Sequence, residues 1–494
     1  MRNMHAALMQ AETKRREGDL RGSEKLCRAI LAEDPLYVGA LQTFGLVSIA
    51  KENFPQAVTC FTTAAAEAPE DWTNFLNLGI TWLGLEQPQM AALMLREARK
   101  LNDSDAETLR LLGEIAMDQR EYDAAMASLR GALERNPDDL KAMAKLADCY
   151  ANLGFFDKAQ TILTELHEKR PDWIAVLGML LQLPRGMTDI DFGAAIGKVK
   201  PQASEPAEIF ENTKQFLQAA NHDREGEPEK AWDILVAANA HVHASNQRRH
   251  QKALERRKSE LEAARTINVG SAAKTKSDAR TAPLFIMGAS RAGKTTLEVV
   301  LSAHADIHRG YENDDVSNAC KRASQSAGLT KISRLSGLPE PLHGSFSDFF
   351  ESHIDQVAAQ KKYITNTNPG LIGSAAQLAN ALRHARFVFV TRDRNDLALR
   401  IFMKKYKRGN EYAYDLSTIF KHIDWVETMI ALLVKKLGKR ALHIRYEELV
   451  ADPQLVSEQV LDLCGLHKAG FTAAAVGSDV GASAPYRMQL ESRS

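Results

Sequence analysis

The 494-residue sequence is poor in cysteine, in long apolar runs and in net charge, and each shortage excludes a class of protein. Its five cysteines are an odd number and include no Cys-x-x-Cys pair, so neither a disulfide framework nor a zinc site is predicted. Most of them occupy apolar helical positions, which indicates small buried hydrophobes. No run of 18 uncharged apolar residues occurs and charges interrupt the opening segment, so we expect a cytoplasmic protein without a membrane span or signal peptide.

The formal net charge is zero, but the charge is not evenly spread along the chain. Residues 281–494 contain 27 Lys and Arg against 22 Asp and Glu, and the rest of the chain has the opposite excess. This asymmetry suits a small anionic ligand in the C-terminal part. It is too weak for a nucleic-acid-binding protein, which would need a denser basic stripe.

A 34-residue repeat fills the first third of the chain. Small residues that let two helices approach closely recur in every repeat, at Ala11, Gly45, Gly79, Gly113 and Ala147, and again at Ser23, Ala57, Ala91, Ala125 and Ala159. An apolar stripe continues through Cys27, Phe61, Leu95, Leu129 and Leu163, and the repeats stop at Pro35, Pro69, Asp103, Pro137 and Pro171. The pattern predicts an all-α solenoid of five tetratricopeptide repeats over residues 1–173, whose groove is expected to bind a protein or peptide.

Residues 174–267 are predicted to form a helical connector. It contains a sixth, weaker repeat-like hairpin from about Ile209 to His241, followed by the basic helix "NQRRHQKALERRKSELEAAR". Because acids are interleaved with the bases, we expect this helix to be a solvated bridge and not a nucleic-acid contact. Residues 268–282, rich in Gly, Ser, Ala and Lys, are predicted to be a linker, and residues 283–494 a second domain.

From residue 283 onward, short apolar strands alternate with helical patterns. The predicted strands are 283–287, 363–365, 386–391 and 441–445, and helices are predicted after the first strand and around 374–384, 395–407, 414–437 and 453–464. This alternation is typical of a parallel sheet covered by helices. The predicted fold class is therefore an N-terminal all-α tetratricopeptide-repeat solenoid joined to a C-terminal α/β domain of the P-loop type.

The segment "GASRAGKTTL", residues 288–297, follows the first predicted strand and opens a helix. A glycine-rich turn at a helix N-terminus surrounds a phosphate group with backbone N–H donors. The candidate binding residues are Gly288, Arg291, Ala292, Gly293, Lys294, Thr295 and Thr296. By its spacing alone the loop fits either the triphosphate of ATP or GTP or a different phosphorylated donor.

The strand predicted at 386–391 helps to separate these alternatives. A nucleoside triphosphatase needs an acid at the end of a second strand to hold magnesium, whereas this strand is followed by Arg392. An arginine there repels a metal ion and attracts a second phosphate, so no metal is expected.

Three segments resemble the bacterial tetratricopeptide-repeat sulfotransferases, relatives of the tyrosylprotein sulfotransferases. They are "PLFIMGASRAGKTTLEVVLSAHADIHRGYE", "RFVFVTRDRNDLALRIF" and "ALHIRYEELVADPQLVSEQVLDLCGL". The resemblance implies that the donor is 3′-phosphoadenylyl sulfate (PAPS), with its 5′-phosphosulfate in the loop and its 3′-phosphate at Arg392. It places the base that takes the acceptor proton at Glu312. His308 is our own fallback candidate for this base. Arg291 and Lys294 are the candidates to contact the phosphosulfate, and the hydroxyl groups of Thr295 and Thr296 are candidate hydrogen-bond donors to it.

The sequence departs from this family's pattern at several positions. Lys294 and Arg400 stand where the family carries a threonine and a serine, and Arg400 is interpreted as a second contact to the 3′-phosphate. Thr367 and Leu371 stand where a lysine and an asparagine are expected. The C-terminal stretch "VGASAPYRMQL" is only loosely similar to the motif that closes over the donor, with Ser483 and Arg487 as its candidates.

Three functions follow from these patterns. The leading one is a PAPS-dependent sulfotransferase whose repeats recruit a hydroxyl-bearing acceptor, either a protein tyrosine or a glycan. The second is an inactive repeat scaffold with a nucleotide-binding domain, and the third a P-loop NTPase or kinase. The enzyme interpretation requires the Arg392 guanidinium to line a cationic pocket near the loop. A guanidinium that faces away from the loop, or is buried against a carboxylate with no room for a ligand, would overturn it and leave a repeat-bearing adaptor.

Overall fold

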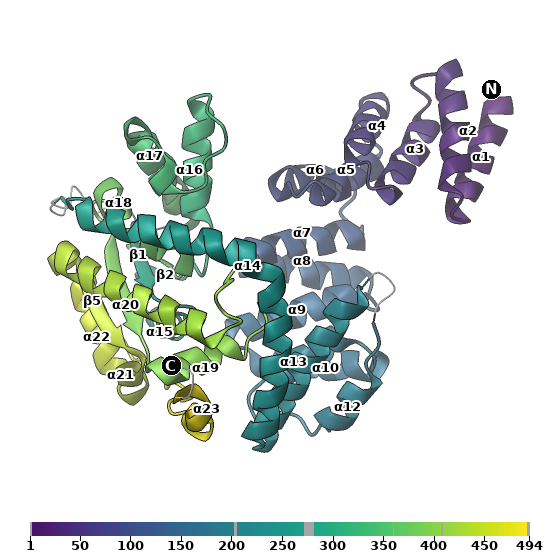
Figure 1. The fold of residues 1–494 in the computed structure, drawn as a ribbon. Helices are drawn as coiled ribbons and strands as arrows, with labels where there is room; N and C mark the ends of the chain where they lie inside the picture. The colour runs from purple at the N-terminus through teal and green to yellow at the C-terminus, as the bar shows by residue number, and fades with distance from the viewer. Residues whose placement is uncertain (1, 202–204, 271–280, 359, 407–408, 492–494) are drawn as a thin grey trace. The chain divides into compact units, whose positions relative to one another are not determined.

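The computed structural model describes residues 2–201, 205–270, 281–358, 360–406 and 409–491. The chain divides into two compact units, residues 1–189 and 190–494 (Figure 1). The sequence-predicted linker at 268–282 lies mostly outside the described residues. Among the described helices, none is both long and apolar enough to cross a bilayer.

The first unit is a series of helix pairs, as the 34-residue repeat predicts. Its helices are α1 Arg2–Arg16, α2 Leu20–Glu33, α3 Val38–Ala50, α4 Phe54–Glu67, α5 Trp72–Gly84, α6 Pro88–Leu101, α7 Ala106–Asp118, α8 Tyr122–Arg135, α9 Leu140–Leu153, α10 Phe156–Lys169 and α11 Ile174–Gln182. The second helix of each of the five repeats ends two residues before the predicted stop, for example α4 at Glu67 before Pro69. Aspartate and asparagine side chains cap several first and second helices, such as Asp105 with the Thr108 N–H at 2.7 Å.

Close helix packing explains the small residues of the repeat. A Cβ added to Gly113 would lie 2.7 Å from Cγ of Leu129, and Gly45 and Gly79 face Phe61 and Leu95 in the same way. The predicted apolar stripe is fully buried in all five repeats. The all-α solenoid of the predicted fold class is therefore confirmed.

Three helices open the second unit, α12 Phe192–Lys198, α13 Ala207–Glu225 and α14 Pro228–Thr266. The predicted sixth hairpin corresponds to α13 and the start of α14, which pack through buried Ala231 and Leu235. The basic stretch is not a separate helix, because α14 runs through it without a break. Nor is it a solvated bridge: Ala253, Arg257 and Ala264 are buried, and the Arg257 carbonyl accepts a hydrogen bond from the Trp425 indole at 3.0 Å.

A five-stranded parallel sheet forms the centre of the second unit, in the order β2-β3-β1-β4-β5. The strands are β1 Ala282–Met287, β2 Ile307–His308, β3 Tyr363–Asn366, β4 Arg386–Thr391 and β5 Ala441–Arg445. Four of them were predicted from the sequence, and the two-residue β2 was not. The helices are α15 Lys294–Leu301, α16 Asp315–Ser326, α17 His343–Ala358, α18 Ala375–Ala381, α19 Arg394–Phe402, α20 Leu416–Leu437, α21 Tyr446–Ala451, α22 Pro453–Cys464 and α23 Arg487–Glu491.

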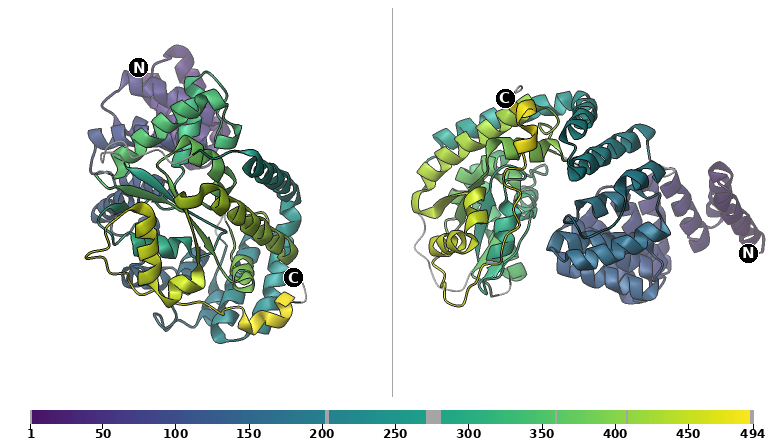
Figure 2. Two further views of the ribbon diagram at one scale, coloured as in Figure 1. Left: turned by 90° about the vertical axis from the view of Figure 1, so that its left-hand side faces the viewer. Right: turned by 90° about the horizontal axis from the view of Figure 1, so that it is seen from below.

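The sheet separates two apolar cores, because alternate side chains of a strand point to opposite faces. Phe285 and Met287 of β1 pack on one face with α16 to α20, whereas Leu284 and Ile286 pack on the other face with α15 and α22. Figure 2 shows helices on both sides of the strands. The α/β part of the predicted fold class is thus confirmed, and the five cysteines are all buried thiols, as predicted.

Candidate functional site

The strand order places the glycine loop beside Arg392. Strands β1 and β4 are neighbours in the sheet, but the chain leaves β1 toward β2 and leaves β4 toward β5, in opposite directions. Such a divergence of connections opens a crevice at the carboxyl ends of the two strands, where ligands bind in α/β sheets. Residues 288–293 follow β1, and Arg392 follows β4, which pairs with β1 at Met287 and Phe389. The two sequence-predicted phosphate sites therefore start on adjacent strands.

Close contacts on both flanks fix the loop. A Cβ on Gly288 would lie 2.3 Å from the Val390 carbonyl oxygen of β4. Gly293 has φ +96°, and a Cβ there would lie 2.2 Å from Cδ2 of Tyr446. Both glycines are thus required by backbone approach or by conformation, and Arg291 adopts a left-handed conformation as well, with φ 68°.

Lys294, the first residue of α15, is a buried cation. Only 3% of it is exposed, and its Nζ donates to the carbonyl oxygen of Ala289 at 2.7 Å within the same loop. Burial lowers the pKa of this ammonium to about 8, while the Glu312 carboxylate opposes the shift and Arg291 adds to it. These three predicted residues are therefore close enough to affect one another electrostatically, and Lys294 can change its charge just above neutral pH.

Glu312 is carried by a tightly held turn between β2 and α16. The buried Glu298 of α15 accepts from the Tyr311 N–H at 2.9 Å and from the Thr365 hydroxyl at 2.6 Å. The N–H of Thr367 donates to the Tyr311 carbonyl at 3.0 Å. The turn is thus tied to both α15 and β3, and the exposed Glu312 carboxylate lies close enough to Lys294 to act on its charge.

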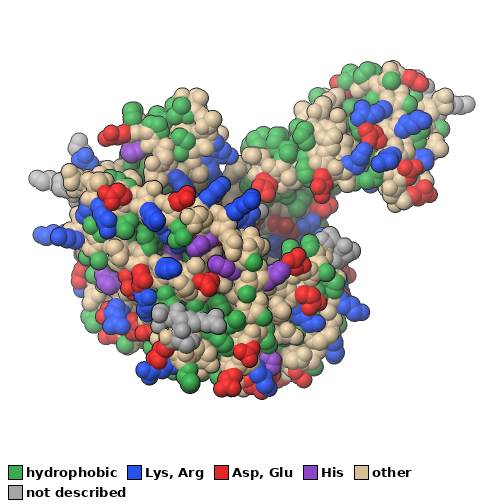
Figure 3. Space-filling model, viewed as in Figure 1, with side chains coloured by type: hydrophobic (Ala, Val, Ile, Leu, Met, Phe, Trp, Pro, Cys, Tyr) green, Lys and Arg blue, Asp and Glu red, His purple; other side chains and the backbone are tan. Residues whose placement is uncertain are grey.

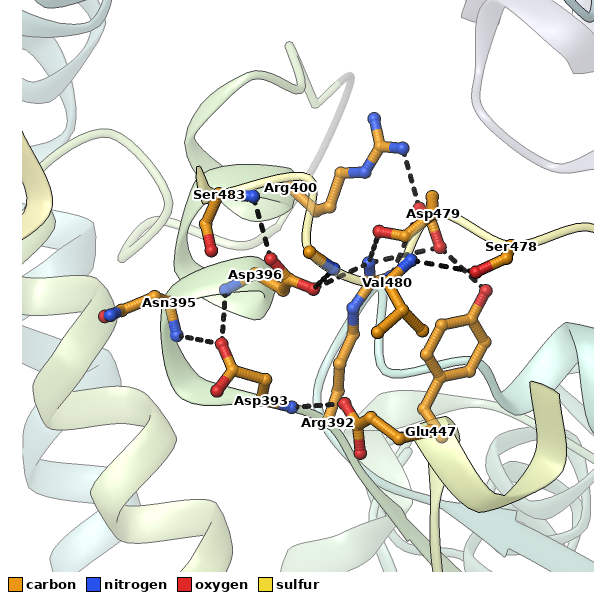
Figure 4. A network of polar contacts seen from close by, with 12 residues as sticks. Arg392, Asp393, Asn395, Asp396, Arg400, Glu447, Ser478, Asp479, Val480 and Ser483 are labelled. Carbon is orange, nitrogen blue, oxygen red and sulfur yellow. Dashed lines mark hydrogen bonds and ion pairs between the residues drawn. The ribbon is translucent and has the colours of Figure 1, made fainter. Parts of the chain in front are cut away.

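Arg392 and Arg400 converge on one carboxylate, that of Asp479 (Figure 4). Arg392 Nη2 lies 3.1 Å from Asp479 Oδ1, and Arg400 Nη2 lies 2.7 Å from Oδ2. The Tyr446 hydroxyl donates to Oδ1 at 2.7 Å, and its ring lies under the Arg392 guanidinium at 4.5 Å. Burial raises the pKa of Asp479, but the tyrosine hydrogen bond and the two guanidinium groups outweigh burial and hold this pKa below its usual range.

This arrangement differs from the expected open pocket at Arg392. The side chain is buried and paired with a carboxylate supplied by the C-terminal segment, which the sequence motifs did not indicate. A hollow beside it, lined by Ala289, Val390 and Leu397 among others, measures about 10 Å³, which is room for about one water molecule. Arg392 therefore follows the strand next to the loop's strand, but its guanidinium is paired with Asp479 and not open to a ligand, which contradicts the predicted pocket.

The remaining predicted residues are more scattered. Thr295 and Thr296 lie in the first turn of α15, at the loop. Thr367 is buried and its hydroxyl oxygen has no hydrogen-bond partner, and Leu371 packs at the edge of a core. His308 is in β2, where it pairs with Ile364 of β3. Arg487 pairs with Glu491 on an exposed face of α23, and Ser483 meets Asp396 only through its N–H.

Sequence reasoning missed four residues that build this site: Asp479, Asp396, Glu298 and Tyr406. Glu298 is a lone acid within the apolar "LEVVL" helix, a signal that could have marked it. Tyr406 reaches the loop from the segment after α19, with its hydroxyl 3.4 Å from the Ser290 hydroxyl. No sequence pattern marks Asp396 or Asp479, because their role arises from contacts between distant segments.

The surface of the second unit mixes both signs of charge. On the face seen in Figure 3, Lys and Arg side chains are interspersed with Asp and Glu. That face does not present the dense basic stripe that nucleic acid requires.

Known proteins match the two units separately. Residues 283–469 match a model described as the sulfotransferase family, and residues 76–139 and 116–183 each match a tetratricopeptide-repeat model. Protein-tyrosine sulfotransferase 1 of Danio rerio is 26% identical over 176 residues, covering 35% of this chain and 49% of that protein. Protein-tyrosine sulfotransferase 2 of Gallus gallus is 23% identical over 188 residues, covering 37% and 51%. The chain thus spans about half the length of these curated relatives.

Among solved structures, a tetratricopeptide repeat protein from Parabacteroides merdae covers 49% of this chain and 93% of its own, with 17% identity and a TM-score of 0.38. The sequence matches confirm the resemblance drawn from the motifs. This chain therefore combines tetratricopeptide repeats with a domain of the sulfotransferase family.

Proposed function

We propose that the second unit transfers a sulfuryl group from PAPS to the hydroxyl of a protein tyrosine or a glycan, and that the repeat unit recruits the acceptor or a partner protein. The observation that carries this proposal is the placement of the glycine loop and of Arg392 on adjacent strands of a sulfotransferase-family domain. Five free cysteines, all buried, suit a reducing compartment, so we place the reaction in the cytoplasm.

The reaction assigns a role to each residue near the loop. The acceptor oxygen forms a bond to sulfur, the bond from sulfur to the 5′-phosphate oxygen breaks, and the acceptor proton passes to the Glu312 carboxylate. The products are a sulfate ester and adenosine 3′,5′-bisphosphate. Lys294 and Arg291 stabilise the charge that develops on the leaving phosphate, and the loss of one such donor typically costs about 3 to 4 kcal/mol.

A second function, the inactive scaffold, is favoured by a specific observation. Arg392 is paired with Asp479 and not open to a ligand, which is the arrangement expected of a domain that no longer binds its donor. A P-loop NTPase has less support, because Asp393, next to the strand-end arginine, accepts from the N–H groups of Asn395 and Asp396 as the cap of α19.

Transfer from isotopically labelled PAPS to tyrosine peptides and glycans tests the proposal directly. We expect label in one acceptor class with the wild-type chain and none with Glu312→Gln, while adenosine 3′,5′-bisphosphate still binds that variant. Asp314→Asn is the matched control, since Asp314 is an exposed acid two residues away. Donor that stays intact with every acceptor, although the bisphosphate binds, would establish the scaffold. Binding of ATP with magnesium in place of the bisphosphate would establish the NTPase.

A further inference from the structure

The C-terminal segment 474–483, here called the strap, crosses the arginine pair with little support of its own. It has no regular secondary structure up to Asp479, and most of its residues are exposed. Three groups of contacts hold it and the residues that follow. Asp479 binds Arg392 and Arg400, and the carboxylate of Asp396 accepts from the Gly481 and Ser483 N–H groups at 2.6 and 2.8 Å (Figure 4). The hydroxyl of the buried Tyr486 donates to Asp223 of α13 at 2.8 Å.

The arginine pair offers more donors than Asp479 can use. The carboxylate has two oxygens, and they already accept from both guanidinium groups and from the Tyr446 hydroxyl. The Nε–H groups of Arg392 and Arg400 are nevertheless buried without a hydrogen-bond partner. Two converging arginines with unused donors suit an anion larger than a carboxylate, because a phosphate group presents three terminal oxygens.

We propose that Asp479 is an internal stand-in for a nucleotide phosphate: it occupies the arginine pair in the free protein, and the 3′-phosphate of the donor displaces it and releases the strap. The proposal rests on the donor binding proposed above. A phosphate cannot share the site with Asp479, because the two anions would compete for the same guanidinium groups and repel each other at close range. Asp396, with Oδ2 3.8 Å from Arg392 Nη2, is a second carboxylate beside the pair. Asp479 thereby lowers donor affinity and selects for nucleotides whose phosphate binds strongly enough to replace it.

The displaced strap would remain attached at both ends. Before it, the Ala473 N–H donates to Gln454 at 2.8 Å, and after it Tyr486 packs against Trp232 with 6.0 Å between ring centroids. Gly477 and Gly481 lie between these anchors, and a Cβ at either would meet nothing within 4 Å. Release therefore needs the loss of the Asp479 contacts and of the Gly481 and Ser483 hydrogen bonds to Asp396, and no unfolding of a described helix or strand.

Calorimetric titration of Asp479→Asn tests the displacement. The asparagine keeps the shape but removes the competing charge, so adenosine 3′,5′-bisphosphate should bind at least about tenfold more tightly than to the wild-type chain, a difference of about 1.4 kcal/mol. Adenosine 5′-monophosphate, which lacks the 3′-phosphate, should bind both chains equally. Asp424→Asn is the matched control, because Asp424 forms an exposed ion pair with Arg394 elsewhere in the domain, and this variant should change neither affinity.

The outcomes separate this inference from the proposed function. If Asp479→Asn binds the bisphosphate no more tightly than the wild type, or tightens both nucleotides alike, the displacement is wrong although the donor site stands. If neither chain binds the bisphosphate, the donor site itself is refuted and this inference falls with it. Hydrogen exchange of the unmodified chain supplies a test independent of how the variant folds: saturating bisphosphate should speed exchange in residues 474–483, and unchanged or slower exchange would overturn the proposal.

Discussion

The charge state of Lys294 gives the sharpest prediction about the loop. Burial, partly opposed by Glu312, sets the pKa of its ammonium at about 8 in the free protein. The protonated fraction then falls from about nine-tenths at pH 7 to about one-tenth at pH 9, whereas nucleotide phosphates lose their second proton near pH 6 and do not change in this range. Because an anionic donor requires the charged lysine, its affinity is retained below pH 8 and lost above it.

The expected loss is about tenfold in the affinity for adenosine 3′,5′-bisphosphate between pH 7 and pH 9, close to 1.4 kcal/mol. Calorimetry should measure it, and titrations at pH 8 in two buffers of different ionisation enthalpy should show the uptake of about half a proton per nucleotide bound.

Lys294→Met is the control for this pH dependence. It removes the titrating group, so its binding should be weaker at pH 7 and flat between pH 7 and pH 9. A wild-type affinity that stays constant over this range would refute the reasoning, because it would mean that the ammonium either has an ordinary pKa or lies outside the field of the donor.

Three further predictions concern single residues. Glu312→Gln should move the midpoint of the pH curve of Lys294 to lower pH, because it removes the carboxylate that raises the lysine pKa. An unchanged midpoint would mean that the two groups are too far apart to interact. Gly293→Ala should lower the free energy of unfolding of the second unit by about 2 to 4 kcal/mol, measured in urea, because the new methyl group collides with the ring of Tyr446 and the backbone has a positive φ. A decrease below about 1 kcal/mol would show that the loop relaxes around the methyl group. In the first unit, Gly113→Ala should lower the free energy of unfolding by about 1 to 3 kcal/mol, because its methyl group would collide with Leu129. Gly131→Ala, whose methyl group would meet nothing nearer than 3.5 Å, should raise it by about 0.5 to 1 kcal/mol through helix propensity. Equal effects of the two substitutions in thermal unfolding would contradict the packing argument.

The sequence by itself determined the features that depend on local pattern. The recurrence of Gly45, Gly79 and Gly113 with apolar partners sixteen residues later specified the helix pairs, because each repeat has to bury the same interface. The alternating apolar strands specified a parallel sheet, and the glycine loop could be placed at the start of α15. The helix pairs, the strands and the glycine loop can be predicted from the sequence because residues close together in the chain form them.

Other features were missed because they are weakly patterned or depend on packing. The strand β2 is only two residues long, which is too short to show alternation. The basic stretch of α14 looks solvent-exposed in sequence, since acids and bases alternate along it, yet Arg257 is buried against the rings of Tyr412 and Trp425. The order of the strands in the sheet, which places β1 beside β4, also came only from the tertiary structure.

The state of the arginine pair was decided only by the tertiary structure. Arg392 was identified from its place after a strand, but its partner Asp479 is 87 residues away in a segment without a recognisable motif. Whether a strand-end guanidinium faces an open pocket or a carboxylate depends on where a distant, irregular segment returns in space, and local sequence periodicity carries no information about that return. The sequence therefore located the arginine after its strand, and the fold determined which group is paired with it.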